Sequence, residues 1–290
     1  MNVKPKPPIK WVGGKRQLMD VIQNNLPKEF NRYYEPFVGG GALLFELSLE
    51  DAVINDYNSE LINLYRVIQT NPQDLITDLY KHQNNSEYYY SIRNLDRDIE
   101  TFAKMSNVER ASRFIYLNRT GFNGLYRVNS KNQNNVSFGS YSNPKIVDEE
   151  NILACSKLLK ATTILEGDFE NIKPLIEKGD FIYLDPPYVP LTETSNFVSY
   201  TDQGFDNEMQ IRVKNLCDYI NDIGAYFMAS NSSADFILDL YKDYNVMLVN
   251  ANRSLNCKGD KRGSVKEVLV INYWLFVYLH IRLFILTILT

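Results

Sequence analysis

The sequence contains few of the residues that form disulfides or bind metals. Three cysteines (Cys155, Cys217 and Cys257) and two histidines occur among its 290 residues. The cysteines are too few and too scattered for a disulfide framework, and none is paired at the spacing of a metal-binding motif. We therefore expect no metal site, and we expect the cysteines to be reduced thiols in a cytoplasmic protein.

Two common phosphate-binding motifs are also missing. The glycine-rich turn Gly39-Gly40-Gly41 lacks the Gly-x-Gly-x-x-Gly spacing of the dinucleotide fingerprint, and no Gly-Lys-Ser/Thr of a P-loop follows it. The segment from Met1 to Pro8 has no apolar core of the kind that a signal peptide needs. We therefore expect neither of these nucleotide-binding motifs and no secretion signal.

The chain ends in an apolar run. Residues 274–290 are almost wholly apolar, interrupted by His280 and Arg282. Together with residues 268–273 this run approaches the length of a membrane span, but its polar interruptions and the place of its first part in the predicted sheet argue against one. A strand pair, a partner-binding patch or an adventitious extension fits better, and we assign the tail no role.

The distribution of charge is more informative than its sum. A net charge of −4 does not by itself indicate a nucleic-acid partner. The basic residues, however, gather in three acid-poor windows, residues 1–16, 110–147 and 253–266. Any one window could be a solvated face, but each also carries a motif, which favours a surface that follows phosphates.

The tetrapeptide Asp185-Pro186-Pro187-Tyr188 is the most informative motif present. It follows the apolar run 181–184, which is typical of a buried strand. Because two prolines cannot continue a central strand, the chain turns there, at the end of the strand where open α/β sheets bind ligands. A carboxylate and backbone carbonyls beside an aromatic ring suit methyl transfer to the exocyclic amine of a base.

Strand and helix patterns alternate at both ends of the chain. This alternation predicts an α/β fold, with a mostly parallel Rossmann-like sheet covered by helices on both faces. The predicted strands are residues 32–36, 51–54, 163–166, 181–184, 224–230, 246–249 and 265–273. The predicted helices are residues 42–49, 60–69, 207–223 and 234–241, with one more that starts at Gln17.

The middle of the chain has a different composition. Residues 71–147 are rich in Asn, Tyr, Arg and Ser and lack strand alternation. Helical patterns at residues 72–81 and 107–117 flank a polar stretch, residues 118–143, that we expect to bury little. We predict a discontinuous catalytic domain, residues 1–70 and 148–273, with a small, mainly helical insert that presents a polar loop, residues 71–147, followed by the tail 274–290.

Several residues near strand ends are candidates for binding a cofactor. Glu35-Pro36-Phe37-Val38-Gly39-Gly40-Gly41 is a strand-to-helix turn whose glycines let the backbone approach a ligand. Asp56 follows the next strand, where an acid can hold ribose hydroxyls. Asp168-Phe169 could bind an adenine amine and cover its ring, and Trp11 and Lys15 could close over the cofactor. Each motif alone is weak evidence, but the ordered set is specific.

In this order the motifs resemble those of the Dam-type DNA adenine-N6 methyltransferases. The matching pieces are Lys10-Trp11-Val12-Gly13-Gly14-Lys15, residues 34–41, Ile54-Asn55-Asp56, residues 118–141, Gly167-Asp168-Phe169, the tetrapeptide and Ser230-Asn231-Ser232. The resemblance implies S-adenosyl-L-methionine as methyl donor and adenine in double-stranded DNA, within 5′-GATC, as the target. The donor contacts that it implies are Trp11, Lys15, Glu35, Phe37, Gly39, Gly41, Asp56, Asp168, Phe169 and Asp185. A restriction–modification role, with a cognate restriction endonuclease acting separately, stays open.

The tetrapeptide supplies the predicted catalytic residues Asp185, Pro186, Pro187 and Tyr188. Asp185 and the Pro186 carbonyl can accept the two amine hydrogens as positive charge grows on the nitrogen, while Tyr188 stacks on the base. We expect direct in-line transfer to an adenine that is flipped out of the duplex. Cytosine carbon-5 methylation needs a cysteine nucleophile, and no cysteine here follows a proline.

The same resemblance implies that the insert is the target-recognition (DNA-binding) part, with DNA-binding residues around it, namely Lys10, Asn123, Leu125, Arg127 and Tyr141. Arg127 is the candidate for a bidentate contact to guanine in the major groove. Ser137 and Ser140 stand where relatives often carry Pro and Arg, which could weaken the grip on phosphates.

Two alternative functions fit these motifs less well. Methyltransferases that act on RNA or on protein amides favour Asn-Pro-Pro-Tyr and lack such an insert. A non-catalytic DNA-binding module would not need the tetrapeptide and the donor residues. Both alternatives are therefore less favoured than a DNA adenine methyltransferase.

Overall fold

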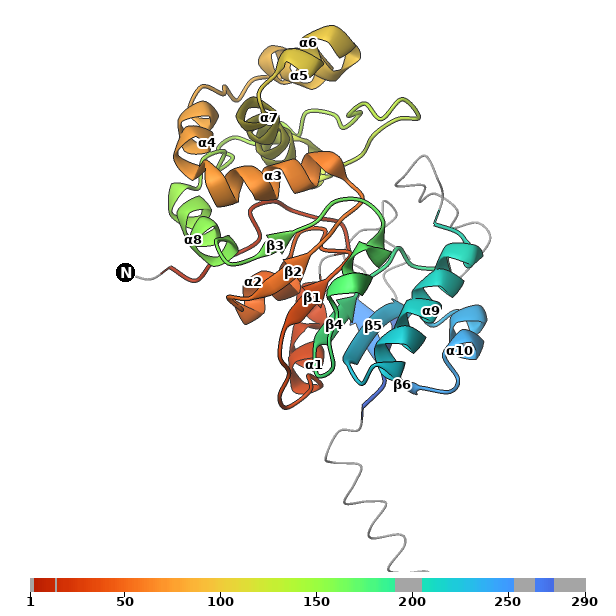
Figure 1. Ribbon diagram of the computed structural model, residues 1–290. Coiled ribbons are helices and arrows are strands. Elements are labelled where there is room, and N and C mark those ends of the chain that lie inside the picture. Colours follow the sequence, from red (N-terminus) through yellow and green to blue (C-terminus); the bar gives the residue numbers. More distant parts are fainter. Residues whose placement is uncertain (1–2, 14, 191–204, 253–263, 274–290) are drawn as a thin grey trace, which may run out of the picture. The chain divides into compact units, whose positions relative to one another are not determined.

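The computed structural model describes residues 3–13, 15–190, 205–252 and 264–273 (Figure 1). Its α-helices are α1 (Met19–Asn24), α2 (Ala42–Leu47), α3 (Ser59–Thr70), α4 (Pro72–Leu79), α5 (Ser86–Asn94), α6 (Ile99–Lys104), α7 (Asn107–Thr120), α8 (Glu149–Leu159), α9 (Asn207–Asp222) and α10 (Asp235–Leu240). Short 3-10 helices are η1 (Lys15–Gln17), η2 (Leu95–Arg97), η3 (Phe122–Gly124) and η4 (Phe169–Leu175). The strands are β1 (Tyr33–Glu35), β2 (Ala52–Ile54), β3 (Thr163–Ile164), β4 (Phe181–Leu184), β5 (Tyr226–Ser232), β6 (Asn245–Asn252) and β7 (Ser264–Ile271).

The strands form a seven-stranded sheet in the order β3-β2-β1-β4-β5-β7-β6. The pairs β2–β3, β1–β4 and β4–β5 are parallel, whereas β7 runs antiparallel to both β5 and β6. Leu184, the last residue of β4, is level with Ala229 of β5, and Ser232 of β5 is level with Glu267 of β7. The predicted α/β fold with a Rossmann-like methyltransferase sheet is confirmed.

The chain packs as two compact units. The first contains the described residues of 1–15 and 37–171, and the second contains those of 16–36, 172–199 and 204–290. These units are defined by packing and not by function, so the predicted division into a catalytic domain and an insert at residues 71–147 stays a prediction.

Helices dominate the first unit, and several of them have capped N-termini and buried apolar faces. The Ser106 side chain accepts a hydrogen bond from the Glu109 amide, and Glu109 bonds back to the Ser106 amide, which makes a capping box at the start of α7. Asn58 caps α3 in the same way through the Leu61 amide. Helices α5, α6 and α8 were not predicted; α5 is polar and tyrosine-rich, α6 has only six residues, and the apolar residues of α8 were overlooked.

The insert buries more than its composition suggests. Tyr89 of α5 and Tyr116 of α7 are fully buried, and Phe138 packs against them. Within the polar stretch, Asn118, Asn134 and Val136 are also buried, with exposed fractions of 6% or less. The expectation that residues 118–143 bury little was therefore wrong. Their buried amides are paired with backbone groups, and this pairing allows polar side chains to be buried.

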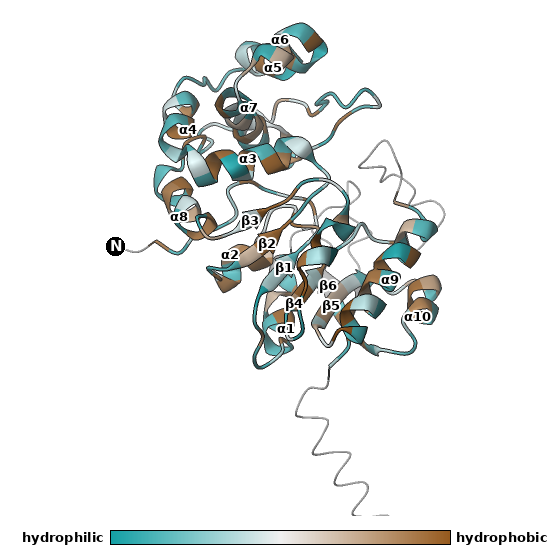
Figure 2. Ribbon diagram, in the orientation of Figure 1, coloured by the Kyte–Doolittle hydropathy of each residue, from teal (hydrophilic) through white to brown (hydrophobic). Residues whose placement is uncertain are grey.

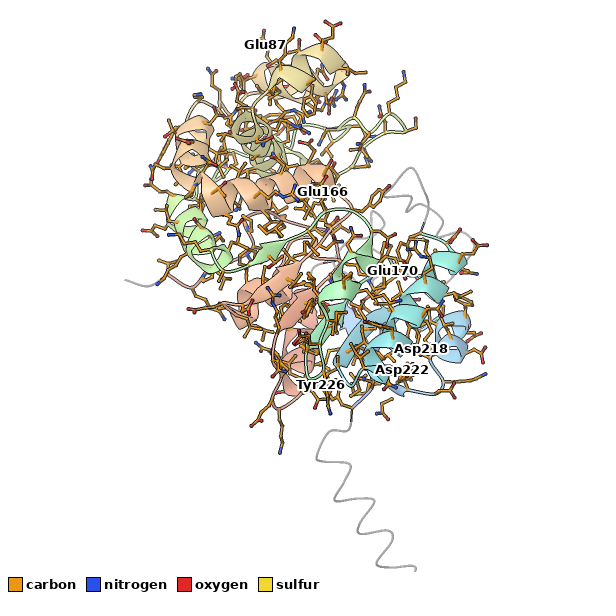
Figure 3. All side chains as sticks on the ribbon, viewed as in Figure 1. Glu87, Glu166, Glu170, Asp218, Asp222 and Tyr226 are labelled. Atoms are coloured by element: carbon orange, nitrogen blue, oxygen red, sulfur yellow. The ribbon has the colours of Figure 1, made fainter. Side chains whose placement is uncertain are left out.

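In the second unit α9 packs its apolar side toward β5. Val213, Leu216 and Ile220 are completely buried, and brown and teal stretches alternate along α9 in Figure 2. Asp218 and Asp222, labelled in Figure 3, lie one helical turn apart on α9. Lys214 pairs with Asp218 at 2.7 Å.

The apolar tail, residues 274–290, lies outside the described residues. Within the described part of the chain, no helix is long and apolar enough to span a bilayer.

Candidate active site and target-recognition segment

The glycine-rich turn folds around backbone hydrogen bonds in the first unit. The Val38 amide donates to the Asn55 carbonyl at 3.0 Å, and the Gly39 amide donates to Asp56 Oδ2 at 2.9 Å. Gly39 has a φ of +46°, and Gly41, which precedes α2, has a φ of +68°. Both values lie in the left-handed region that glycine adopts most readily, so the sequence dictates this turn.

Trp11 lies directly on the turn. A Cβ atom added to Gly39 would lie 2.8 Å from Cδ1 and Nε1 of the indole, and one added to Gly40 would lie 2.8 Å from the Trp11 Cβ. Lys15 is nearly buried, and its ammonium group donates to the Gly13 carbonyl at 3.0 Å. The glycines therefore leave the space that the tryptophan ring occupies. The structure thus brings together two of the predicted donor contacts, Trp11 and Gly39.

Asp56 is held by two backbone amides. Oδ2 accepts from Gly39 at 2.9 Å, and Oδ1 accepts from Asn58 at 3.0 Å. Burial raises the pKa of this carboxyl, although the hydrogen bonds to Asn58 and Gly39 oppose the shift. A carboxylate fixed in this way keeps acceptor capacity for hydroxyl donors such as those of a ribose.

Asp168 and Phe169 lie beside the same turn. The Gly167 amide donates to the Asp56 carbonyl at 3.0 Å, and the Phe37 and Phe169 rings stack with centroids 5.1 Å apart. The Asp168 carboxylate also accepts from the Glu170 amide at 2.9 Å, which starts η4. The first unit thus gathers Trp11 and Lys15, the glycine turn, Asp56 and the Phe37–Phe169 pair around one segment of backbone.

The second unit contains Glu35 and the tetrapeptide. Glu35 is buried at the end of β1 and accepts a hydrogen bond from the Tyr33 hydroxyl at 2.9 Å. Burial, followed by the charge of Glu35, holds the pKa of Tyr33 well above its ordinary value. The phenol therefore stays protonated and remains a donor to Glu35.

The tetrapeptide follows β4 and is held by side chains from neighbouring elements. Ser230 Oγ donates to Asp185 Oδ1 at 2.8 Å, as the β4–β5 register predicts for residues just beyond Leu184 and Ala229. The Tyr188 hydroxyl donates to Glu267 Oε2 of β7 at 2.8 Å. Burial raises the pKa of Tyr188 well above its usual range, and the charge of Asp185 adds to that shift, so the hydroxyl stays neutral.

A buried pair of amide side chains fixes the backbone of the tetrapeptide. Gln210 Nε2 of α9 donates to the Pro187 carbonyl at 2.7 Å, and Asn231 Nδ2 donates to Gln210 Oε1 at 2.9 Å. Asn231 Oδ1 in turn accepts from the Val189 amide at 3.3 Å. Gln210 is fully buried and Asn231 nearly so.

Gln210 and Glu267 were not predicted as site residues. Ser230 and Asn231 were quoted within the matching segment Ser230-Asn231-Ser232, but no role was predicted for them. No pattern in the sequence marks Gln210 or Glu267.

The predicted DNA-binding residues lie on and beside a polar arm, residues 121–139. This arm is closed by isolated bridges between Gly121 and Phe138 and between Val128 and Asn134. Arg127 is exposed, and its Nε and Nη2 donate to Asn135 at 2.6 and 3.1 Å. Asn123 is exposed with a left-handed φ of 55°.

Lys10 is tied to the base of the arm. Its amide donates to Asn118 Oδ1, and its carbonyl accepts from Asn118 Nδ2, both at 2.8 Å. The Lys10 ammonium lies 5.6 Å from the centroid of the Tyr141 ring. The structure thus brings together two of the predicted DNA contacts, while Leu125 lies half-buried on the arm.

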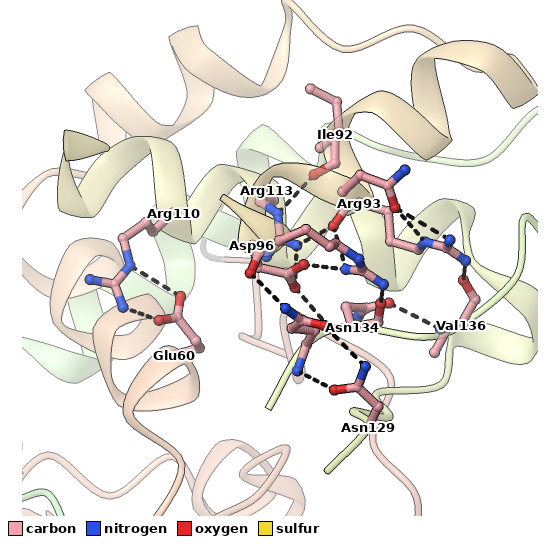
Figure 4. A network of polar contacts seen from close by, with 12 residues as sticks. Glu60, Ile92, Arg93, Asp96, Arg110, Arg113, Asn129, Asn134 and Val136 are labelled. Carbon is pink, nitrogen blue, oxygen red and sulfur yellow. Dashed lines mark hydrogen bonds and ion pairs between the residues drawn. The ribbon is translucent and has the colours of Figure 1, made fainter. Parts of the chain in front are cut away.

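A charged network holds the arm to the helices of the first unit (Figure 4). Asp96 Oδ2 accepts from Arg113 Nη2 at 2.7 Å and from the Asn134 amide at 2.8 Å. Arg97 contacts Asp96 and donates to the Asn134 carbonyl. The Val136 carbonyl accepts from the Tyr89 hydroxyl at 3.0 Å and from Arg93 at 3.2 Å. The Gln133 side chain also donates to the Asp96 carbonyl at 3.4 Å, and the other partners of this network on the arm are backbone atoms.

The site has the features of an α/β methyltransferase. The tetrapeptide Asp-Pro-Pro-Tyr follows the parallel strand β4, the glycine turn follows β1, and the acid Asp56 follows β2. A model of the family described as D12 class N6 adenine-specific DNA methyltransferase matches residues 11–255. The chain therefore belongs to this family, and it is an adenine-specific DNA methyltransferase whose methyl donor is S-adenosyl-L-methionine.

Several relatives match nearly the whole chain. Type II methyltransferase M1.LlaDCHI of Lactococcus lactis subsp. cremoris is 50% identical over 94% of this chain and 97% of its own length. Type II methyltransferase M.MjaIII of Methanocaldococcus jannaschii is 42% identical over 94% of this chain and its entire length. The DNA adenine methylase of Haemophilus influenzae is 34% identical over 93% of this chain and 94% of its own.

The residues of the first unit fit the donor. The indole of Trp11 on the two glycines, the acceptor Asp56 and the Phe37–Phe169 pair provide an aromatic, a carboxylate and two rings to hold an adenosyl group. Among the described residues, no group of three or more His, Cys, Asp and Glu side chains is placed to hold a metal ion.

Proposed function

We propose that the enzyme methylates the N6 amine of adenine in 5′-GATC, on a base flipped out of the duplex, by direct in-line transfer. The assignment of the target rests on the resemblance of residues 118–141 to the recognition segment of Dam-type enzymes. The observation that carries the proposed chemistry is the fixed tetrapeptide, in which Ser230 holds the Asp185 carboxylate and Gln210 holds the Pro187 carbonyl.

The fixed tetrapeptide supplies oxygen acceptors for the amine. Ser230 donates to Oδ1 of Asp185, and a carboxylate can accept hydrogen bonds from several donors at once. Because Gln210 takes the Pro187 carbonyl, we assign the Pro186 carbonyl as the second acceptor for the amine hydrogens. The amine lone pair is delocalised into the purine ring. Two hydrogen-bond acceptors on the amine favour localisation of this lone pair on the nitrogen, and they stabilise the positive charge that grows there during methyl transfer.

Tyr188 is the residue proposed to stack on the flipped base. Its hydroxyl is anchored to Glu267 at 2.8 Å, so the ring is held in place before any base arrives. S-adenosyl-L-methionine supplies an electrophilic methyl group. The adenine nitrogen forms the new N–C bond as the C–S bond breaks, and the amine then loses one proton.

The donor contacts proposed in the first unit are Trp11, Lys15, Phe37, Gly39, Gly41, Asp56, Asp168 and Phe169, and those in the second unit are Glu35 and Asp185. Asp56 is the proposed partner of the ribose hydroxyls. Backbone amides of Gly39 and Asn58 fix its two carboxylate oxygens, and each oxygen can accept a further hydrogen bond. The Phe37–Phe169 pair is the proposed cover for the adenine ring of the donor.

DNA reading is assigned to Lys10, Asn123, Leu125, Arg127 and Tyr141. For a bidentate contact to guanine, Arg127 must present two guanidinium nitrogens, and its Nε and Nη2 now donate to Asn135. We therefore propose that Arg127 exchanges Asn135 for guanine when DNA binds.

A restriction–modification role is supported by two relatives that are named type II methyltransferases. We propose that a separate cognate endonuclease shares the target. With DNA as substrate, we place the enzyme in the cytoplasm.

Methylation mapping tests the proposal. Purified enzyme and S-adenosyl-L-methionine are incubated with plasmid DNA from a host that does not methylate adenine, and every N6-methyladenine is located by sequencing. We expect modification at GATC and nowhere else, and none with Asp185→Ala. Methylation at another sequence would refute the target, and the absence of methyladenine would refute the function.

A further inference from the structure

Tyr126 links the donor turn to the arm within the first unit. Its ring stacks on Trp11 with centroids 5.4 Å apart and on Phe114 at 5.0 Å. Trp11 is the residue that lies against Gly39 and Gly40 of the donor turn. The ring of Tyr126 therefore contacts a donor-site residue, while its neighbours in the chain, Leu125 and Arg127, are proposed readers of DNA.

A second connection runs beside the first. The Asn118 side chain bonds to both backbone groups of Lys10 and donates to the Gly124 carbonyl at 2.8 Å. A Cβ atom added to Gly124 would lie 2.5 Å from the Lys10 Cδ. Residues 10–11 and residues 124–126 are thus joined by a buried amide and by an aromatic stack, which makes a continuous set of contacts between the two segments.

A cavity borders the stack. A cavity of about 60 Å³ is lined by residues that include Phe114, Leu125, Tyr126 and Asn134. Burial raises the pKa of Tyr126 to about 12, opposed by hydrogen bonding to Asn58, which lies two residues after Asp56. The ring is therefore held by Trp11 and Phe114, and it borders this cavity.

We propose that Tyr126 is a positioning residue that couples donor binding to sequence reading. When the donor is bound, Trp11 is fixed on the glycine turn, which fixes Tyr126 and holds Leu125 and Arg127 in the conformation that reads DNA. This inference rests on the proposed role of the arm. Coupling of this kind is reciprocal, so the correct DNA sequence must raise the affinity for the donor by the same factor.

The test compares the binding of two hairpin duplexes, one with the target found by methylation mapping and one with a single base pair of it changed. Each dissociation constant is measured with and without sinefungin, a non-reactive analogue of the donor. In the wild type we expect sinefungin to increase the ratio of the two constants by about fivefold or more. Tyr126→Leu should remove most of this increase, and Tyr126→Phe, which keeps the ring, should retain most of it.

Tyr80→Leu is the matched control, because Tyr80 belongs to the same unit and is 66% exposed. It should retain the full effect of sinefungin. If Tyr126→Leu responds to sinefungin as the wild type does, the inference is overturned. If the wild type binds the two duplexes equally under both conditions, the reading role of the arm fails, and the inference fails with it.

Fluorescence gives a second readout that does not need a substituted Tyr126. The sequence has two tryptophans, Trp11 and Trp274, so Trp274→Phe leaves Trp11 as the sole reporter. Target duplex should change the Trp11 emission more than the altered duplex does, because Tyr126 stacks on the indole. Equal emission with the two duplexes would overturn the inference.

Discussion

Substitution Ser230→Ala tests the arrangement on which the proposed chemistry depends. Ser230 is fully buried, and its hydroxyl donates to Asp185 Oδ1 at 2.8 Å. Hydrogen bonds to charged groups contribute about 1.5–3 kcal/mol. If this bond aligns the carboxylate for the amine in the transition state, its loss should lower kcat by about 10- to 100-fold, because about 1.4 kcal/mol corresponds to a factor of ten.

The assay measures single-turnover methyl transfer from labelled donor to a saturating duplex, together with the thermal unfolding midpoint. Ser232→Ala is a matched control. Ser232 lies on the same strand with 2% exposure, and its hydroxyl has no hydrogen-bond partner among the described residues. This variant should keep both kcat and stability.

The reasoning would be refuted by a kcat within twofold of the wild type for Ser230→Ala. A loss of stability without a loss of rate would show that Ser230 supports the fold and does not position Asp185.

Four further outcomes are expected. Asp185→Ala should abolish transfer yet retain DNA binding in gel shifts, and near wild-type transfer would contradict the role of Asp185 in activating the amine. Arg127→Ala should lose discrimination at one base pair, a cost of about 1–3 kcal/mol in competition binding, whereas an equal fall on all sequences would indicate a phosphate contact. Gly40→Ala adds a methyl group 2.8 Å from the Trp11 Cβ, an overpacking that costs about 1–3 kcal/mol. Donor binding measured by calorimetry should therefore weaken by roughly fivefold or more, and an unchanged affinity would contradict the packing of Trp11 on the turn. Burial lowers the pKa of His82 to about 4, so the folded protein favours the neutral ring. The stability that comes from this preference is present above pH 6.5 and is lost as the pH falls toward 4. His82→Gln should therefore flatten the decline of the thermal unfolding midpoint with falling pH, and parallel pH profiles for the variant and the wild type would contradict this.

The sequence was sufficient to predict the elements whose pattern is local. The run 181–184 and the two prolines after it predicted the end of β4, and the glycine turn before α2 was predicted from Gly39 to Gly41. Both signals arise from backbone conformations that a few residue types dictate. Helix α9 was predicted at 207–223 and observed at Asn207–Asp222, because its apolar periodicity spans four turns.

The residues that hold the tetrapeptide could not be predicted, because their partners are distant in the chain. Gln210 looks like any polar residue of an amphipathic helix, yet it is fully buried and bonded to Pro187 and Asn231. Glu267 lies in a closing strand, 79 residues after Tyr188. Glu267 is level with Ser232 of β5 only because of the register in which β7 pairs with β5, and a sequence pattern does not show this register.

The anchoring of the arm has a consequence for how such enzymes diverge. Asp96 and Arg97 form hydrogen bonds with backbone atoms of Asn134, and Tyr89 and Arg93 donate hydrogen bonds to the carbonyl of Val136. Because these contacts use backbone atoms of the arm, exposed side chains such as that of Arg127 can be exchanged without loss of the attachment. With the DNA-reading role proposed for the arm, new sequence preferences can evolve there, or be selected from a library, on an unchanged scaffold.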